Sequence, residues 1–268
     1  MIRPSRLAAV AGSAALAALL LAGCGGKDTP AAPASGSSEA SASATGQVTV
    51  FAAASLTETF TKLGKDFEAA NKGATVKFSF GASSALAQQI NSGAPADVFA
   101  SASPTNMKQV SDAGAVTDKP TTFVRNRLEI AVPKGNPGKI TGLADFAKPE
   151  HKTALCAEQV PCGAAAKQVF AAAGVTPKPV TLEQDVKATL TKVQLGEVDA
   201  ALVYRTDVQA AGDKVEGIDF PESAKVVNDY PLAVLAKAPN SAAAKAFVAY
   251  VLSDKGRAVF TKAGFDTP

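Results

Sequence analysis

Short apolar runs alternate with amphipathic helical segments from residue 48 to residue 100, and this alternation constrains the fold more than any other sequence feature. In the first helical segment, apolar residues recur at spacings of four, three and four, which places them on one helix face. An alternating order of strands and helices predicts a mostly parallel, doubly wound α/β sheet. The predicted strands here are 48–51, 76–80 and 98–100, and the predicted helices are 56–67 and 86–90.

The alternation continues to the end of the chain and predicts a second α/β lobe. We expect the first lobe to comprise residues 47–124 and 230–268, and the second to comprise residues 125–229. Two chain crossings, near Arg125–Leu128 and Val227–Leu232, would form a hinge, with a cleft between the lobes where the strands end. The further strands are predicted at 128–132, 153–155, 200–204 and 232–236, and the further helices at 167–173, 186–193, 242–252 and 255–263.

The N-terminal residues have the pattern of an export signal. Arg3 and Arg6 precede an uncharged apolar run, Leu7–Leu21, which is shorter than the ~20 residues that span a bilayer. The run leads into Leu21-Ala22-Gly23-Cys24, which resembles a bacterial lipobox, where the cysteine is acylated after cleavage. We therefore expect a signal peptide at 1–23 and a lipid on Cys24 that holds the domain at the extracellular face of the cell membrane.

Residues 24–46 carry the expected lipid and are rich in Ala, Ser, Gly, Pro and Thr. They lack apolar periodicity, so we expect a disordered tether. Residues 1–23 contain two arginines and no acidic residue, so the formal charge of +3 falls to +1 once they are removed. A nearly neutral domain argues against nucleic acid as a partner.

Three cysteines are present, and a lipid on Cys24 would leave Cys156 and Cys162 in an oxidising compartment. This even remainder suggests one disulfide that closes a small loop. The two cysteines are not spaced as C-x-x-C, and His151 is the single histidine, so neither a redox motif nor a metal site is expected.

Four predicted helices begin with small or polar residues directly after a strand or loop. A helix N-terminus carries unpaired N–H groups and a partial positive charge, so several that converge would bind an anion without Lys or Arg. The ordinary alternative is that each residue only caps its helix, and Ser55 and Glu58 have the spacing of a capping box. The four starts contain Ser55, then Ser83 and Ser84 in Gly81–Leu86, then Cys162 in Val160–Gly163, and then Asp185, the expected N-cap, before Val186.

Tyr204 ends the predicted strand at 200–204. Its phenol would donate one neutral hydrogen bond into the cleft. The alternative is a half-buried aromatic residue with a hydrated hydroxyl group.

Taken in chain order, these segments resemble the periplasmic molybdate-binding proteins of ABC transporters. The resemblance covers essentially residues 47 to 267. The segments that carry it are Val50–Thr57, Gly81–Ala87 followed by Gln89-Ile90, Gly93–Ala102, Val160–Gly163, Glu183–Val186, Leu202–Tyr204, Phe220–Glu222 and Tyr230–Val234.

This family implies a type II periplasmic-binding-protein fold, with two doubly wound lobes joined by a two-crossing hinge. It implies a ligand set in which Ser55 and Ser83 offer hydroxyl and backbone N–H groups, Cys162 and Val186 offer backbone N–H groups, and Tyr204 offers its phenol. The family commonly has Ala where Cys162 stands, but a backbone contact survives that change. Ala82 stands where the family often has Ser, so the choice between Ser83 and Ser84 stays open.

The ligand that the resemblance implies is molybdate or tungstate, bound as the oxyanion. A fully deprotonated dianion offers only acceptors, whereas phosphate near neutral pH retains a proton that requires an acceptor. A sulfate- or thiosulfate-binding protein of the same fold is the alternative, because sulfate has the same charge and shape as molybdate. A rigid pocket would separate the two by size, since a ligand that is too small leaves donors unpaired.

Enzyme motifs are absent from the sequence: there is no G-x-S-x-G, S-x-x-K, P-loop or H-E-x-x-H. We therefore expect a binding protein rather than an enzyme, with no cofactor. The three tyrosines are scattered, which argues against an iron-binding relative with clustered ligands. The resemblance implies an ABC permease and its ATPase as partners, and we expect a monomer.

Overall fold

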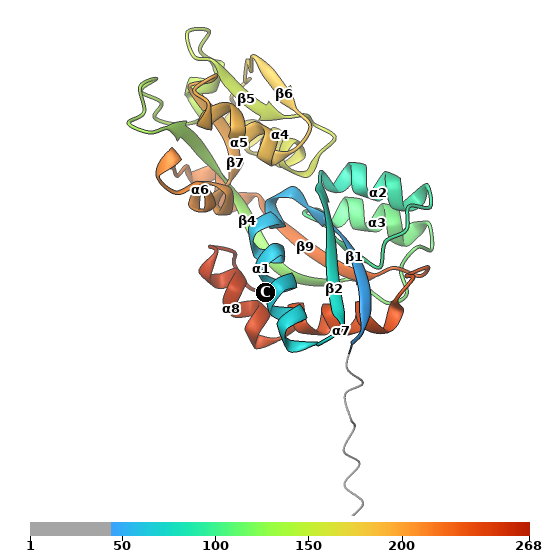
Figure 1. Ribbon diagram of the computed structural model, residues 1–268. Helices are drawn as coiled ribbons and strands as arrows, with labels where there is room; N and C mark the ends of the chain where they lie inside the picture. The colour runs from blue at the N-terminus through green and yellow to red at the C-terminus, as the bar shows by residue number, and fades with distance from the viewer. Residues whose placement is uncertain (1–43) are drawn as a thin grey trace, which may run out of the picture. The chain divides into compact units, whose positions relative to one another are not determined.

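The computed structural model describes residues 44–268, so the predicted signal peptide, Cys24 and most of the predicted tether lie outside the described residues. Nine strands form one sheet with helices packed against it (Figure 1). The strands are β1 (Gly46–Ala53), β2 (Ala74–Gly81), β3 (Val98–Ala100), β4 (Thr121–Pro133), β5 (Thr153–Cys156), β6 (Thr181–Glu183), β7 (Ala200–Tyr204), β8 (Val215–Ile218) and β9 (Val227–Val234). The α-helices are α1 (Thr57–Ala70), α2 (Ser83–Asn91), α3 (Pro104–Asp112), α4 (Pro161–Ala173), α5 (Val186–Gln194), α6 (Arg205–Ala211), α7 (Ser241–Leu252) and α8 (Asp254–Lys262). Short 3-10 helices are η1 (Ala54–Leu56), η2 (Leu143–Ala147), η3 (Gly212–Lys214) and η4 (Pro221–Lys225).

The strand order is β2-β1-β3-β9-β4-β7-β5-β6, and β8 also pairs with β4. Within the first lobe β1 runs parallel to β2 and β3, and within the second lobe β5 runs parallel to β6 and β7. The strands that link the lobes, β4 and β9, are antiparallel to their neighbours. The parallel arrangement predicted from the sequence therefore holds inside each lobe, and the linking strands are antiparallel because one leaves the first lobe and the other returns.

Strand β4 belongs to both lobes and is longer than the predicted strand at 128–132. Its first part pairs with β9, where Arg127 lies opposite Val227, and its second part pairs with β7 from Leu128 onward. Figure 1 shows β4 and β9 running side by side through the connection between the lobes. The two predicted crossings are thus hydrogen-bonded to each other as neighbouring strands. The boundaries of the two lobes remain a prediction.

The first lobe has a core on each face of its sheet. On one face, Phe60 of α1 packs against α7 and α8, and its ring centroid lies 6.2 Å from that of Phe247 and 6.0 Å from that of Phe260. On the other face, α2 and α3 cover Phe99 and Met107. Burial of a Phe side chain stabilises the fold by about 1.5–3 kcal/mol, so these clusters hold the helix starts at fixed positions on the sheet.

The second lobe packs α4 and α5 against β4, β5 and β7 around a separate apolar cluster. Phe146 and Phe170 meet there with ring centroids 5.4 Å apart. Among residues 44–268, no helix is long and apolar enough to span a membrane.

A partly buried carboxyl group lies on β4 in the second lobe. Burial and the nearby negative charge of Asp219 raise the pKa of Glu129 from 4.5 to about 7, although Arg205 opposes the shift. Glu129 lies against Gly217 of β8, where a Cβ atom would come within 1.8 Å of Glu129 Oε1. The glycine therefore leaves the space that this carboxyl group occupies.

This raised pKa predicts how stability depends on pH. Above about pH 4.5 the unfolded chain loses the Glu129 proton more readily than the folded chain, so the contribution to stability falls as pH rises to about 7. The Glu129→Gln variant should therefore raise the melting temperature at about pH 8 and have a smaller effect at about pH 4.5. Thermal unfolding at both pH values tests this, and a larger gain at the acidic pH would contradict it.

Candidate functional site

One small pocket lies between the two lobes, and helix starts from both lobes form its walls. All five residues predicted as ligands line it: Ser55 and Ser83 from the first lobe, and Cys162, Val186 and Tyr204 from the second. The cavity is small: its volume of about 10 Å³ is close to the least that holds one water molecule. The remaining lining residues are Ala53, Ala54, Gly81, Ala82, Ala102, Val160, Pro161 and Asp185.

Ser55 lies in η1, the turn between β1 and α1, and is buried. The capping box predicted for Ser55 and Glu58 is wrong. Leu56 is the N-cap of α1 and no side chain caps it, while the Ser55 hydroxyl forms a 2.9 Å hydrogen bond with the Tyr230 phenol. The Ser55 side chain thus bonds a residue of β9 in place of the first N–H groups of α1.

Ser83 is the first residue of α2, and its side chain is buried. Its Oγ accepts a 2.9 Å hydrogen bond from the backbone N–H of Ala102, which leaves the hydroxyl proton for another acceptor. Ser84 is only partly buried and does not line the pocket. Of the two serines between which the sequence did not decide, Ser83 is thus the one at the pocket.

Cys162 is the second residue of α4 and is bonded to Cys156 at the end of β5, as the sequence suggested. The next residue, Gly163, packs against the same loop, because a Cβ atom there would lie 1.9 Å from the carbonyl oxygen of Ala157. A disulfide and a close glycine contact therefore hold the N-terminus of α4 against the segment that follows β5.

Val186 is the first residue of α5. Its neighbour Asp185 is the N-cap, as predicted, and Asp185 Oδ1 accepts from the backbone N–H groups of Lys187 at 2.8 Å and Ala188 at 2.9 Å. The N–H of Val186 has no partner inside the helix, since the first N–H groups of any helix lack one. That donor lies at the pocket wall.

Tyr204 ends β7, and its phenol is buried without a hydrogen-bond partner among the described residues. Burial raises the pKa of Tyr204 well above its ordinary value, and the neighbouring Tyr230 adds to the shift. Burial likewise raises the pKa of Tyr230. Both phenols therefore keep their protons across the neutral range, and an unpartnered buried O–H is a donor that gains by finding an acceptor.

The pocket offers donors from four helix N-termini and one neutral phenol, and none of its lining residues is Lys, Arg or His. Asp185 is the one acid in the lining, and one of its oxygens is committed to the N-cap. Within residues 44–268, no cluster of three or more His, Cys, Asp or Glu residues could hold a metal ion. The arrangement suits a small species that only accepts hydrogen bonds.

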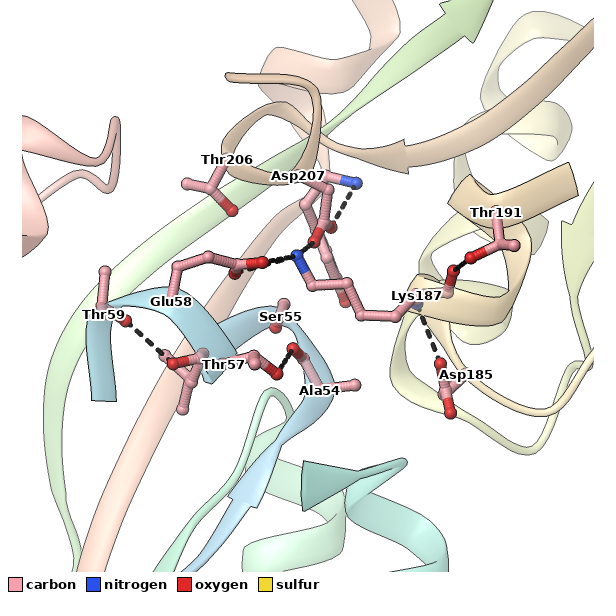
Figure 2. A network of polar contacts seen from close by, with 12 residues as sticks. Ala54, Ser55, Thr57, Glu58, Thr59, Asp185, Lys187, Thr191, Thr206 and Asp207 are labelled. Atoms are coloured by element: carbon pink, nitrogen blue, oxygen red, sulfur yellow. Dashed lines mark hydrogen bonds and ion pairs between the residues drawn. The ribbon is translucent and has the colours of Figure 1, made fainter. Parts of the chain in front are cut away.

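Two groups of polar residues beside the pocket were not predicted as functional. Tyr230 on β9 orients the Ser55 hydroxyl from a position 175 residues away. Glu58, Lys187 and Asp207 form an ion-pair network next to Ser55 and Val186 (Figure 2). Neither group has a local sequence signal, because the partners are 175 and 129 positions apart in the sequence.

Comparison with known proteins gives one family match and several similar proteins. The model of the bacterial extracellular solute-binding protein family matches residues 48–266. The molybdate-binding protein ModA of Mycobacterium tuberculosis is 41% identical over 94% of this chain and 96% of its own length. The putative ABC transporter substrate-binding lipoprotein YvgL of Bacillus subtilis is 32% identical over 81% of this chain and 85% of its own length.

Solved structures agree on the fold. The periplasmic molybdate-binding protein of Azotobacter vinelandii aligns with a TM-score of 0.73 at 22% identity, over 82% of this chain and 99% of that chain. The sulfate-binding protein SubI of Mycobacterium tuberculosis aligns with a TM-score of 0.72 at 19% identity, over 82% of this chain and 86% of that chain. Both alignments include both lobes, and the fold is that of the type II periplasmic binding proteins.

The disulfide predicts a measurable loss of stability when it is removed. Cys156 and Cys162 are six positions apart, and the chain-entropy model gives a contribution of about 2 kcal/mol for so short a loop. The double variant Cys156→Ala with Cys162→Ala should lose about that much free energy of unfolding in a denaturant titration. Treatment of the original protein with a reductant should give a similar loss and leave the double variant unchanged, and a reductant effect on the variant would contradict this.

Proposed function

Since this chain belongs to the molybdate-binding ModA family of bacterial extracellular solute-binding proteins, we propose that it captures molybdate outside the cell and delivers it to an ABC importer. The similar proteins reported above have the names of binding proteins and not of enzymes. Tungstate has the same charge and shape as molybdate, and we propose it as a second ligand.

The observation that carries this proposal is the convergence of neutral donors on one small pocket. Ser55 and Ser83 contribute hydroxyl and backbone N–H groups, Cys162 and Val186 contribute backbone N–H groups, and Tyr204 contributes its phenol. A tetrahedral dianion has four acceptor oxygens and no proton, so it can accept from all of these groups. Helix N-termini supply the partial positive charge that balances it.

Phosphate is a poorer ligand for such a pocket because it retains a proton near neutral pH. The one acidic side chain in the lining, Asp185, already caps α5 through Oδ1. Sulfate carries no proton and remains the alternative ligand. The likeness to the sulfate-binding SubI concerns the fold, whereas the sequence relative at 41% identity has the name of a molybdate-binding protein.

Capture would proceed by closure of the two lobes, which we place at residues 47–124 with 230–268 and at residues 125–229. An anion that bridges donors of both lobes stabilises the closed form, because it has more partners there than in an open form. An ABC permease with its ATPase would then recognise the closed form of a monomeric binding protein.

A lipid on Cys24 would keep the protein at the extracellular face of the membrane. The support for this is the lipobox-like sequence at 21–24 and the name of the lipoprotein relative in Bacillus subtilis.

The variant Cys24→Ser tests the anchor, since it should lose the lipid and be found away from the membrane fraction. The original protein should require detergent for release, and equal release of both proteins would reject the anchor.

Isothermal titration with molybdate, tungstate, sulfate and phosphate tests the ligand. We expect one-to-one binding of molybdate that is much tighter than that of sulfate or phosphate. Tight sulfate binding with weak molybdate binding would support the alternative ligand. A folded protein that binds none of these anions would reject the proposal.

Substitution of single donors tests the ligand set, and the chain provides matched controls. Ser83→Ala and Tyr204→Phe should each weaken molybdate binding by about 10- to 100-fold, the effect of losing one hydrogen bond to a charged group. Ser84→Ala and Tyr250→Phe remove the same groups away from the pocket and should leave the dissociation constant unchanged. A larger loss of molybdate affinity in either control variant than in its matched variant would overturn the assignment of Ser83 or Tyr204 as a ligand.

A further inference from the structure

Two sets of ion pairs connect the lobes among residues 44–268. One lies at the hinge, where Asp266 near the C-terminus pairs with Arg127 of β4 at 2.8 Å and with Arg205 of α6 at 3.1 Å. The other lies beside the pocket, where Lys187 Nζ of α5 is 2.8 Å from Glu58 Oε1 of α1 and 3.0 Å from Asp207 Oδ1 of α6.

The pocket-side set links α1 and α5, which begin beside the pocket, to α6, which begins directly after Tyr204 (Figure 2). Lys187 follows Val186 directly, and Glu58 lies three positions after Ser55. Asp207 accepts a 3.2 Å hydrogen bond from the backbone N–H of Tyr204. The position of Lys187 is therefore coupled to the donors of both lobes.

Two of the three charged groups in this network are shielded from solvent, and the third, Glu58, is about half exposed. Asp207 is fully buried, the Lys187 side chain is 25% exposed and the Glu58 side chain is 52% exposed. Burial opposes the charge on Lys187, but the two carboxylates outweigh it, so the pKa of Lys187 is raised. The ammonium group donates to both Glu58 carboxylate oxygens, at 2.8 and 2.9 Å, and also contacts Asp207. Its hydrogen bonds therefore go to the two carboxylates and not to the pocket.

From this geometry we propose that Glu58, Lys187 and Asp207 form a latch that stabilises the closed form of the oxyanion pocket, with Lys187 as the positioning residue. Asp207 holds Lys187 within the second lobe, and the contact with Glu58 is the one that crosses to the first lobe. A 2.8 Å ion pair between the lobes cannot persist when they separate, so its contribution belongs to the closed form alone. The latch rests on the proposed function, because it acts on the same pocket.

The Glu58→Gln variant gives a test in which the sign of the effect is decisive. Removing a negative charge close to an anion site should tighten binding if only the long-range field matters. The latch predicts the opposite, a molybdate dissociation constant about two- to fivefold higher, in the range expected for loss of a partly exposed ion pair. The matched control is Asp66→Asn. Asp66 lies on the same helix as Glu58, but its ion-pair partner, Lys62, is on that helix too, so this pair does not join the lobes.

A second comparison guards against simple loss of folding. Lys187→Met alone would leave the buried Asp207 without its partner, so it is made together with Asp207→Asn, which can still accept from Tyr204 N–H. This double variant should weaken binding to the same extent as Glu58→Gln. Adding Glu58→Gln to it should cause no further loss, because the pair is already broken.

Titration calorimetry with molybdate, sulfate and phosphate on the original protein and all variants separates the outcomes. Weaker binding in Glu58→Gln, no weakening in Asp66→Asn and no further loss in the triple variant would support the latch. Unchanged or tighter binding in Glu58→Gln, while the original protein binds, would reject the latch and leave the proposed function intact. If the original protein binds none of the three anions, the proposed function and the latch both fail.

Discussion

The backbone ladder of β4 is the interaction on which the rest of the structure depends. Its hydrogen bonds pass from β9 to β7 at Arg127 and Leu128, so one strand is part of both lobes. Together, β4 and β9 set the distance between the two lobes at the hinge. The helix starts of both lobes meet at one small pocket because this connection keeps the lobes side by side.

The pocket receives its positive potential from the backbone rather than from charged side chains. Four helix starts and a neutral phenol line it, and the nearest ammonium group, Lys187, is paired with two carboxylates. A domain of nearly zero net charge can therefore present an anion site without attracting acidic macromolecules. Rigid placement of the donors then matters more than their charge. The Cys156–Cys162 bridge and the close packing of Gly163 hold one of those donors in place.

Local periodicity predicted most of this fold. The helix starts and the family resemblance indicated the five candidate ligand residues, all of which line the pocket. Strands such as β1 and helices such as α1 and α5 have apolar spacings that are evident in short windows of sequence. Helix α3 was not predicted, although Ser103 caps it and Pro104 begins it, because its apolar face is short. Strands β6 and β8 contain three and four residues, which is too short for a reliable alternation.

Contacts between distant residues were the part that the sequence could not provide. Ser55 has the spacing of a capping residue, but its side chain binds Tyr230, which lies 175 positions later. The pair of Glu58 and Lys187 is separated by 129 positions. No short pattern encodes such pairs, because the partners lie far apart in the sequence. The resemblance to a known family identified the ligand set, but it did not identify these supporting residues.

The disulfide also has a consequence for when the protein becomes complete. A bridge between Cys156 and Cys162 persists in oxidising compartments and is kept reduced in the cytosol. A newly made chain inside the cell would therefore lack one of the two restraints on the start of α4. In the exported protein proposed above, this restraint on the pocket would form only outside the cytosol, so the chain would reach the ion with a pocket completed after export.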